Sequence, residues 1–173
     1  MTKSTLNSSH TKVAKDNSDS KSTAPKRSLT PRRRAREYAL QGIYQSLVVR
    51  RAGSLPNGAN IAKQLAEDPA FKRCQLDLFQ GIFSGVLERA DELEVLITPT
   101  LDRPINELSP VEHAALLIGA YELACDLSVP YKVAINEAVE LAKTFGGTDG
   151  HKYVNGVLDL LAQKLRAAET NAD

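Results

Sequence analysis

At the centre of the chain, residues 109–127 read SPVEHAALLIGAYELACDL. Ser109 and Glu112 form the pattern of a capping box, in which the hydroxyl and the carboxylate each satisfy a free backbone amide at a helix start. The residues that follow are apolar on almost every side of such a helix. A helix without a polar face belongs inside a domain, because water would otherwise contact its apolar side chains. The stretch therefore predicts a central helix surrounded by other helices.

On the N-terminal side, the pattern predicts a helix that begins at Thr30 and Pro31. Thr can cap free amides, and Pro needs no donor at the first helical position. Its apolar stripe consists of Ala35, Ala39, Ile43 and Leu47, spaced four residues apart. Gly53 fits the end of this helix.

Two further helices are expected before the central one. The first covers residues 61–67 and is capped by Asn60. The second is a single long helix that Pro69 opens and that ends near residue 97, before Pro99 breaks the pattern.

On the C-terminal side, Pro130 is expected to start a helix and Gly146 to end it. Its predicted buried stripe is Ile135, Ala138, Val139, Ala142 and Phe145. The turn GGTDG follows, with Asp149 as a candidate cap, and Val154, Val157, Leu158, Leu161 and Leu165 then mark a last helix. No segment alternates like a strand, so the fold class is all-α, a bundle of six or seven helices.

Charge and composition divide the chain into a tail and a domain. Residues 1–36 hold ten of the 22 Lys and Arg residues but only two of the 21 Asp and Glu residues. Residues 1–30 are polar and contain few aliphatic side chains, so we expect a disordered basic tail followed by a helical domain at 31–173. A basic end on an acidic body indicates that contact with a polyanion is localised there.

Several classes of protein are disfavoured. Apolar runs are too short to cross a membrane and the first residues lack the apolar core of a secretory signal. Cys74 and Cys125 have neither disulfide-scaffold nor zinc-site spacing, which favours two buried free thiols in a reducing cytoplasm. His113 and His151 lack partners at metal-ligand spacing, and Glu137 and Glu140 fit an exposed helix face. We expect no catalytic activity, no cofactor and no metal.

The arginine cluster of the first helix is the strongest candidate site. It comprises Arg32, Arg33, Arg34 and Arg36. Guanidinium groups match phosphates and stack on bases, and Tyr44 projects within roughly 20° of Arg33 around the helix axis. We expect Arg33 and Arg36 to be exposed and to grip an unpaired nucleic-acid strand whose base stacks on Tyr44. The alternative is a basic patch that only improves solubility.

The turn FGGTDGHKYVNG, residues 145–156, is the second candidate. It leads into a helix whose start carries Lys152 and Tyr153, and free amides at a helix start can hold phosphate. A plain turn between two helices accounts for the same glycines. Neither a P-loop nor a dinucleotide-binding motif is present.

These stretches together resemble the NusB family. The strings that carry the resemblance are RRRARE, LSPVEHAALLIGAYEL, VPYKVAINEAVELAKTFG and DGHKYVNGVLD, within residues 31–166. The resemblance implies two packed three-helix bundles with about seven helices. It also implies binding of single-stranded boxA RNA with NusE, a ribosomal protein, in a complex in which other Nus factors and RNA polymerase take part.

Residue roles follow from the same resemblance. The RNA contacts it implies are Arg32, Arg33, Arg34, Arg36, Tyr44, Asp149, Lys152 and Tyr153. Glu112 would lie where the RNA and NusE surfaces meet. Tyr153 replaces a Phe expected there, and Leu117 replaces an Arg common in the family. Some family members form dimers through the arginine face. A homodimer in which this contact covers the RNA site is therefore an open alternative.

Two other functions remain to be weighed. NusB-like domains also occur fused to RNA methyltransferases, but that activity needs a glycine-rich cofactor loop that this sequence lacks. A helical protein-interaction module with a non-specific basic tail is the other alternative. Sequence-selective RNA binding that weakens steeply with salt would separate the RNA-binding hypothesis from that module.

Overall fold

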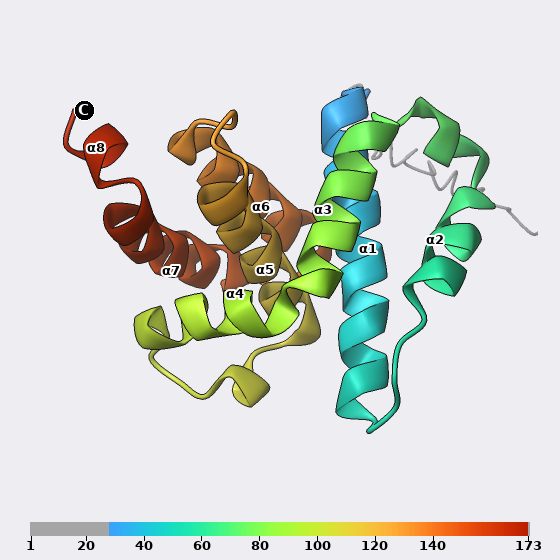
Figure 1. Cartoon of the computed structure of the whole chain (residues 1–173), viewed down its shortest axis with the longest axis horizontal. Coiled ribbons are helices and arrows are strands. Elements are labelled where there is room, and N and C mark those ends of the chain that lie inside the picture. The colour runs from blue at the N-terminus through green and yellow to red at the C-terminus, as the bar shows by residue number, and fades with distance from the viewer. Residues whose placement is uncertain (1–27, 173) are drawn as a thin grey trace, which may run out of the picture.

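The computed structural model describes residues 28–172, and within this range its regular elements are helices alone (Figure 1). The α-helices are α1 (Pro31–Arg51), α2 (Gly58–Ala66), α3 (Leu76–Glu88), α4 (Ala90–Ile97), α5 (Pro110–Cys125), α6 (Tyr131–Phe145), α7 (Gly150–Leu165) and α8 (Ala167–Thr170). Short 3-10 helices occupy Pro69–Arg73, Thr98–Thr100 and Ile105–Glu107. The all-α prediction is confirmed. Residues 1–27, which make up nearly all of the predicted tail, lie outside the described residues.

The helices form two groups of three. α1 packs against α2 and α3, while α5, α6 and α7 pack against one another. α4 connects the groups, and α1 also packs directly on α5. In Figure 1, α1 and α3 run side by side in one half of the molecule, and α6 and α7 lie in the other. This is the expected pair of three-helix bundles.

The central position of α5 is confirmed. The hydroxyl of Ser109 accepts from the amide of Glu112, and the Glu112 carboxylate accepts from the amide of Ser109, each at 3.2 Å. Residues 113–120 are all buried. A Cβ at Gly119 would lie 2.5 Å from a methyl carbon of Leu158, so α5 and α7 approach closely at this point.

α1 also follows the prediction. The hydroxyl of Thr30 accepts from the amide of Arg33 at 3.1 Å, and Pro31 is the first helical residue. The predicted stripe Ala35, Ala39, Ile43 and Leu47 is at most 3% exposed. Gly53 adopts φ 80° just beyond the helix end, a conformation that favours glycine.

The long helix predicted from Pro69 to residue 97 is wrong. Pro69 starts a 3-10 helix, the chain turns at Cys74 and Gln75, and a second break at Arg89 separates α3 from α4. Figure 1 shows α4 running across the end of α3.

Aromatic packing explains the first break. The rings of Phe71 and Phe79 have centroids 5.0 Å apart. Eight residues of continuous helix would separate the two backbone positions by about 12 Å along the axis. The chain must therefore turn between them, because otherwise Phe71 could not join the row formed with Tyr38, Phe79 and Phe83.

Smaller expectations also differ. The short helix begins at Gly58, and its cap is Asn57, whose side chain accepts from the amide of Asn60. Phe145 is 37% exposed instead of buried, because it is the last residue of α6 before the chain turns away. Cys74 and Cys125 are free, as expected, but only partly buried. Within residues 28–172, no helix combines the length and apolarity that crossing a bilayer requires.

Candidate nucleic-acid interface

The start of α1 carries four arginines on less than two helical turns, so their side chains leave the helix in different directions. Arg32 is exposed, Arg33 and Arg34 are partly buried, and Arg36 is buried. No acidic residue occupies the first turn. The cluster is therefore not one uniform basic face, and each arginine has its own environment.

Arg36 is the main departure from the predicted site. Its guanidinium donates to Glu122 of α5 at 2.8, 3.0 and 3.2 Å, and the two side chains are 3% and 0% exposed. Burial raises the pKa of Glu122 above its usual value, and the Arg36 guanidinium opposes that rise. The expected exposure of Arg36 is wrong. Its guanidinium joins α1 to α5 and does not face solvent, where an RNA would bind.

Arg33 makes the second link between the bundles. Its Nε and Nη2 donate to the two carboxylate oxygens of Glu137 on α6, each at 3.3 Å. The Arg33 side chain remains 39% exposed, whereas that of Glu137 is 18% exposed. The hydrogen bond to Glu137 raises the pKa of Arg33 above its ordinary value. Glu137 was expected on an exposed helix face, which is wrong because it packs against α1.

Arg32 and Arg34 are less tightly held. Arg32 has one long hydrogen bond, 3.4 Å, from its Nη1 to Gln75. The Nε of Arg34 is buried and has no hydrogen-bond partner in the described part of the chain. Burial raises the pKa of the neighbouring Glu37, and the charges of Arg34 and Arg33 oppose the rise.

Tyr44 lies further along the same helix and is 41% exposed. Since α1 is continuous from Pro31 to Arg51, Arg33 and Tyr44 project on nearly the same side of it, about 16 Å apart along the axis. The rigid helix therefore presents Arg33 and an accessible ring on one face.

The start of α7 forms a second group of candidate residues. Asp149 occupies the capping position, but its side chain caps no amide; it forms an ion pair with Lys152 at 3.2 Å instead. Both side chains are exposed. Gly150 is buried against Glu112, whose Oε1 would lie 2.7 Å from a Cβ at that position. The Glu112 carboxylate thus caps α5 and contacts the start of α7.

Tyr153 is covered by a residue that sequence reasoning missed. The guanidinium carbon of Arg103 lies 4.3 Å from the centre of the Tyr153 ring, which also packs against the apolar core. The Nε of Arg103 donates to the carboxylate of Asp102 at 2.8 Å, and this hydrogen bond lowers the pKa of Asp102. Arg103 lies in a proline-containing segment without other basic residues, so no local pattern predicted that it contacts Tyr153. A base that stacks on this face of the ring must displace Arg103; otherwise it meets the guanidinium first.

The structure therefore places the predicted residues in two groups. Arg32, Arg33, Arg34 and Tyr44 lie on α1, and Asp149, Lys152 and Tyr153 lie at the start of α7. α6 packs on both α1 and α7 and so connects them. Residues 28–172 contain no cluster of three or more His, Cys, Asp or Glu side chains that could hold a metal ion.

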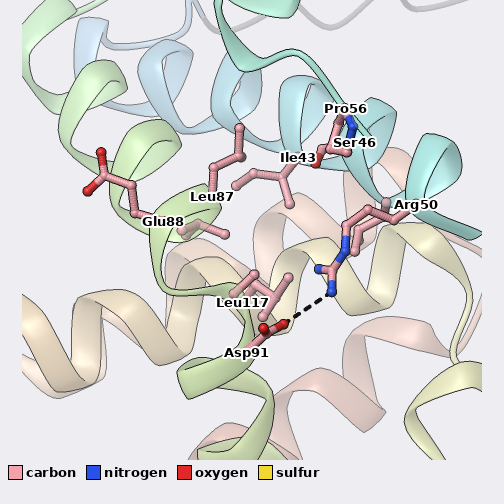
Figure 2. A pocket seen from close by; sticks show the side chains of 11 residues that line it. Ile43, Ser46, Arg50, Pro56, Leu87, Glu88, Asp91 and Leu117 are labelled. Atoms are coloured by element: carbon pink, nitrogen blue, oxygen red, sulfur yellow. Dashed lines mark hydrogen bonds and ion pairs between the residues drawn. The ribbon is translucent and has the colours of Figure 1, made fainter. Parts of the chain in front are cut away.

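A separate hollow of about 310 Å³ opens between α1, α3 and α4. Figure 2 shows the ion pair of Arg50 and Asp91, whose atoms are 3.2 Å apart, beside Leu117. Leu117 is 1% exposed, so this side chain, where an Arg was expected in similar sequences, forms part of an apolar floor. The hollow therefore combines an exposed ion pair at its rim with an apolar floor.

Comparisons with known proteins point to one family. The sequence model of the NusB family matches residues 33–163. A protein from Ralstonia pickettii named transcription antitermination protein NusB is 49% identical over 160 residues, which cover 92% of this chain and 99% of the relative. A protein of the same name from Nitrosospira multiformis is 56% identical over 137 residues, covering 79% of this chain and 84% of the relative. The solved structure of T. maritima NusB matches with a TM-score of 0.67 at 28% identity, covering 83% of this chain and 99% of that one.

Proposed function

Because the chain belongs to the NusB family of transcription antitermination proteins, we propose that it binds single-stranded boxA RNA together with the ribosomal protein NusE. The observation that carries the proposal is that α1 presents the partly exposed Arg33 and Tyr44 on one face, with the exposed Arg32 on its first turn. Arginine forks bind phosphates, and an accessible ring stacks an unpaired base. A rigid helix fixes their spacing before the RNA arrives, which lowers the entropic cost of binding.

The start of α7 extends the proposed RNA surface. Lys152 is exposed and can leave Asp149 for a phosphate at little cost, because exposed ion pairs contribute little stability. Tyr153 takes part through the Arg103 guanidinium that covers it, and Asp149 shapes the surface. Glu112 lies beside this helix start and is proposed to face NusE.

The proposed protein acts by binding and has no catalytic step or cofactor of its own. It works in the cytoplasm with other Nus factors and RNA polymerase, where the complex lets the polymerase pass terminators. We propose that the RNA-binding domain begins at residue 31 and that the basic residues before it lie outside that domain. The alternative is a protein-interaction module whose arginines only confer solubility.

The test compares affinity for a boxA-containing RNA with affinity for a scrambled RNA of equal length, with and without NusE. We expect tighter binding of boxA, with an affinity that falls steeply as salt rises. Arg32→Ala and Tyr44→Ala should each weaken boxA binding about tenfold, because each removes a phosphate contact or a stacked base. Lys63→Ala, an exposed residue of α2, is the control for loss of one positive charge.

Two results would contradict the proposal. Equal affinity for boxA and scrambled RNA would favour the interaction module. Equal weakening by Lys63→Ala and Arg32→Ala would show that only the total charge matters.

A further inference from the structure

The Arg33–Glu137 pair lies beside an open hollow of about 340 Å³. Its lining consists of Ser28, Leu29, Thr30, Arg33 and Glu137. Two hydroxyl groups and the guanidinium are thus available around one space, and all can donate hydrogen bonds to an anion. The hollow has the donors and the room for a phosphate group, but Arg33 already holds a carboxylate there.

Glu137 has a second arginine within reach. Its Oε2 lies 3.9 Å from Nη1 of Arg36, whose other nitrogen atoms donate to Glu122. If Arg33 turned away, the charge of Glu137 would still be offset by Arg36. This matters because a partly buried carboxylate without a cation is costly.

We propose that Glu137 is an internal competitor of RNA phosphate for Arg33. In the free protein, Arg33 binds the Glu137 carboxylate; when RNA binds, the arginine fork turns to a backbone phosphate in the hollow, and Arg36 retains Glu137. This inference rests on the proposed RNA-binding function and adds a regulatory residue, Glu137, which the RNA need not touch. Carboxylate and phosphate present similar paired oxygen atoms to the fork, so the exchange conserves the hydrogen bonds of Arg33.

The competition has a measurable cost. An ion pair with one partner about two-fifths exposed contributes little to stability, so the free-energy cost of breaking it is small. RNA must nevertheless break the Arg33–Glu137 pair in order to bind Arg33, and this cost lowers the RNA affinity. Replacing Glu137 by Gln keeps the shape of the side chain and removes the charge that holds Arg33. We expect Glu137→Gln to tighten RNA binding about threefold to fivefold.

The control is Glu140→Gln, on the same helix. This change removes the same charge, but Glu140 pairs with Lys143 at 3.3 Å and reaches Arg33 only through long-range attraction. We expect a smaller effect than that of Glu137→Gln. Glu137→Gln should increase the RNA affinity less in a chain that also carries Arg33→Ala than in the wild-type chain, because no Arg33 remains to be released. Equal effects of the two Gln variants, or an undiminished effect of Glu137→Gln without Arg33, would overturn the inference.

A measurement on the unaltered protein covers the case in which a variant folds poorly. The Nε–H signal of Arg33, assigned by its absence in Arg33→Lys, should shift on addition of RNA, while that of Arg36 stays near its position. An unmoved Arg33 signal at saturating RNA overturns the inference.

The result also separates this inference from the proposed function. If boxA and scrambled RNA bind equally, the proposed function fails, but the coupling of Glu137 to Arg33 can still be measured on either RNA. If boxA is preferred and the coupling is absent, only the inference fails. Absence of any RNA binding by the wild-type chain and by Glu137→Gln overturns both.

Discussion

Arg33 and Arg36 lie three residues apart on α1, and their surroundings differ in the property that decides their roles. Arg33 has a partly exposed side chain, so its charge can be offered to a ligand. Arg36 is enclosed with Glu122 in the interface between α1 and α5. Of these two neighbours, Arg36 joins the bundles, and Arg33 is the one proposed to bind RNA.

Arg36→Ala is expected to lower the free energy of unfolding by about 3–5 kcal/mol, because it leaves the Glu122 carboxylate buried without its cation. Arg33→Ala, which removes a partly exposed pair, should cost less than about 1 kcal/mol. Denaturant unfolding of the two variants checks the difference. Equal stability of the two variants would show that Glu122 finds another partner or takes up a proton at no cost.

At the scale of single helices, local signals set the starts of α1 and α5, whereas tertiary packing set the ends of α3. Thr30 and Ser109 cap their helices as the sequence predicts. Residues 69–97 read as one amphipathic pattern, yet the chain turns twice so that Phe71 reaches Phe79 and α4 crosses to α5. Periodicity alone therefore cannot locate a break that distant aromatic contacts stabilise.

Phe79→Ala is expected to destabilise the protein by about 3–5 kcal/mol. Phe79 is 3% exposed and its ring lies between those of Phe71 and Phe83, so truncation leaves a cavity that the neighbouring rings cannot fill. Thermal or denaturant unfolding measures the loss.

The control for this change is Leu76→Ala on the same helix. Leu76 is 48% exposed, so its truncation should cost less than about 1 kcal/mol. A near-zero effect of Phe79→Ala would contradict the packing of α3 described above.

At the scale of the whole molecule, a polar network joins the end of α1 to α4 and α5. Arg51 lies 3.2 Å from Nδ1 of His113, and His113 Nε2 lies 3.1 Å from Glu94. Since arginine can only donate, Nδ1 accepts, and the proton on Nε2 is donated to Glu94. Arg50 lies 3.5 Å from the same carboxylate. The network connects the N-terminal bundle to the C-terminal one.

This network makes stability depend on pH. The hydrogen bond from His113 lowers the pKa of Glu94, and the charges of Arg50 and Arg51 lower it further, although burial opposes the shift. A carboxyl whose pKa is lower in the folded chain than in the unfolded chain stabilises the fold above the ordinary pKa of about 4.3. That contribution is lost as the pH falls through the lowered pKa.

Glu94→Gln should therefore be less stable than the wild-type chain at pH 7, and the two should converge as the pH falls below about 4. Free energies of unfolding measured from pH 7 to pH 3 test this, with Glu92→Gln, an exposed residue of α4, as the control. Parallel curves for Glu94→Gln and the wild-type chain would contradict the assignment of the pKa shift.

The buried cation Arg166 illustrates the limit of prediction from sequence. Its guanidinium donates to the main-chain oxygens of Glu122, Leu123, Asp126 and Val129, and so satisfies the carbonyls at the end of α5 from the far end of α7. Nothing in the residues around Arg166 indicates this role. The partners lie about 40 residues away, and only the fold brings them together.

The amino-acid sequence alone determined the helical class, the caps of α1 and α5 and the central place of α5, because each depends on side chains within one or two helical turns. Tertiary structure alone decided which arginines face solvent, that Arg103 covers Tyr153, and that Glu137 holds Arg33. Those features depend on contacts between α1, α5 and α6 and, for Arg103, on a contact between the segment before α5 and the start of α7. Burial and charge pairing are properties of the assembled interior, and a local pattern of residues does not contain them.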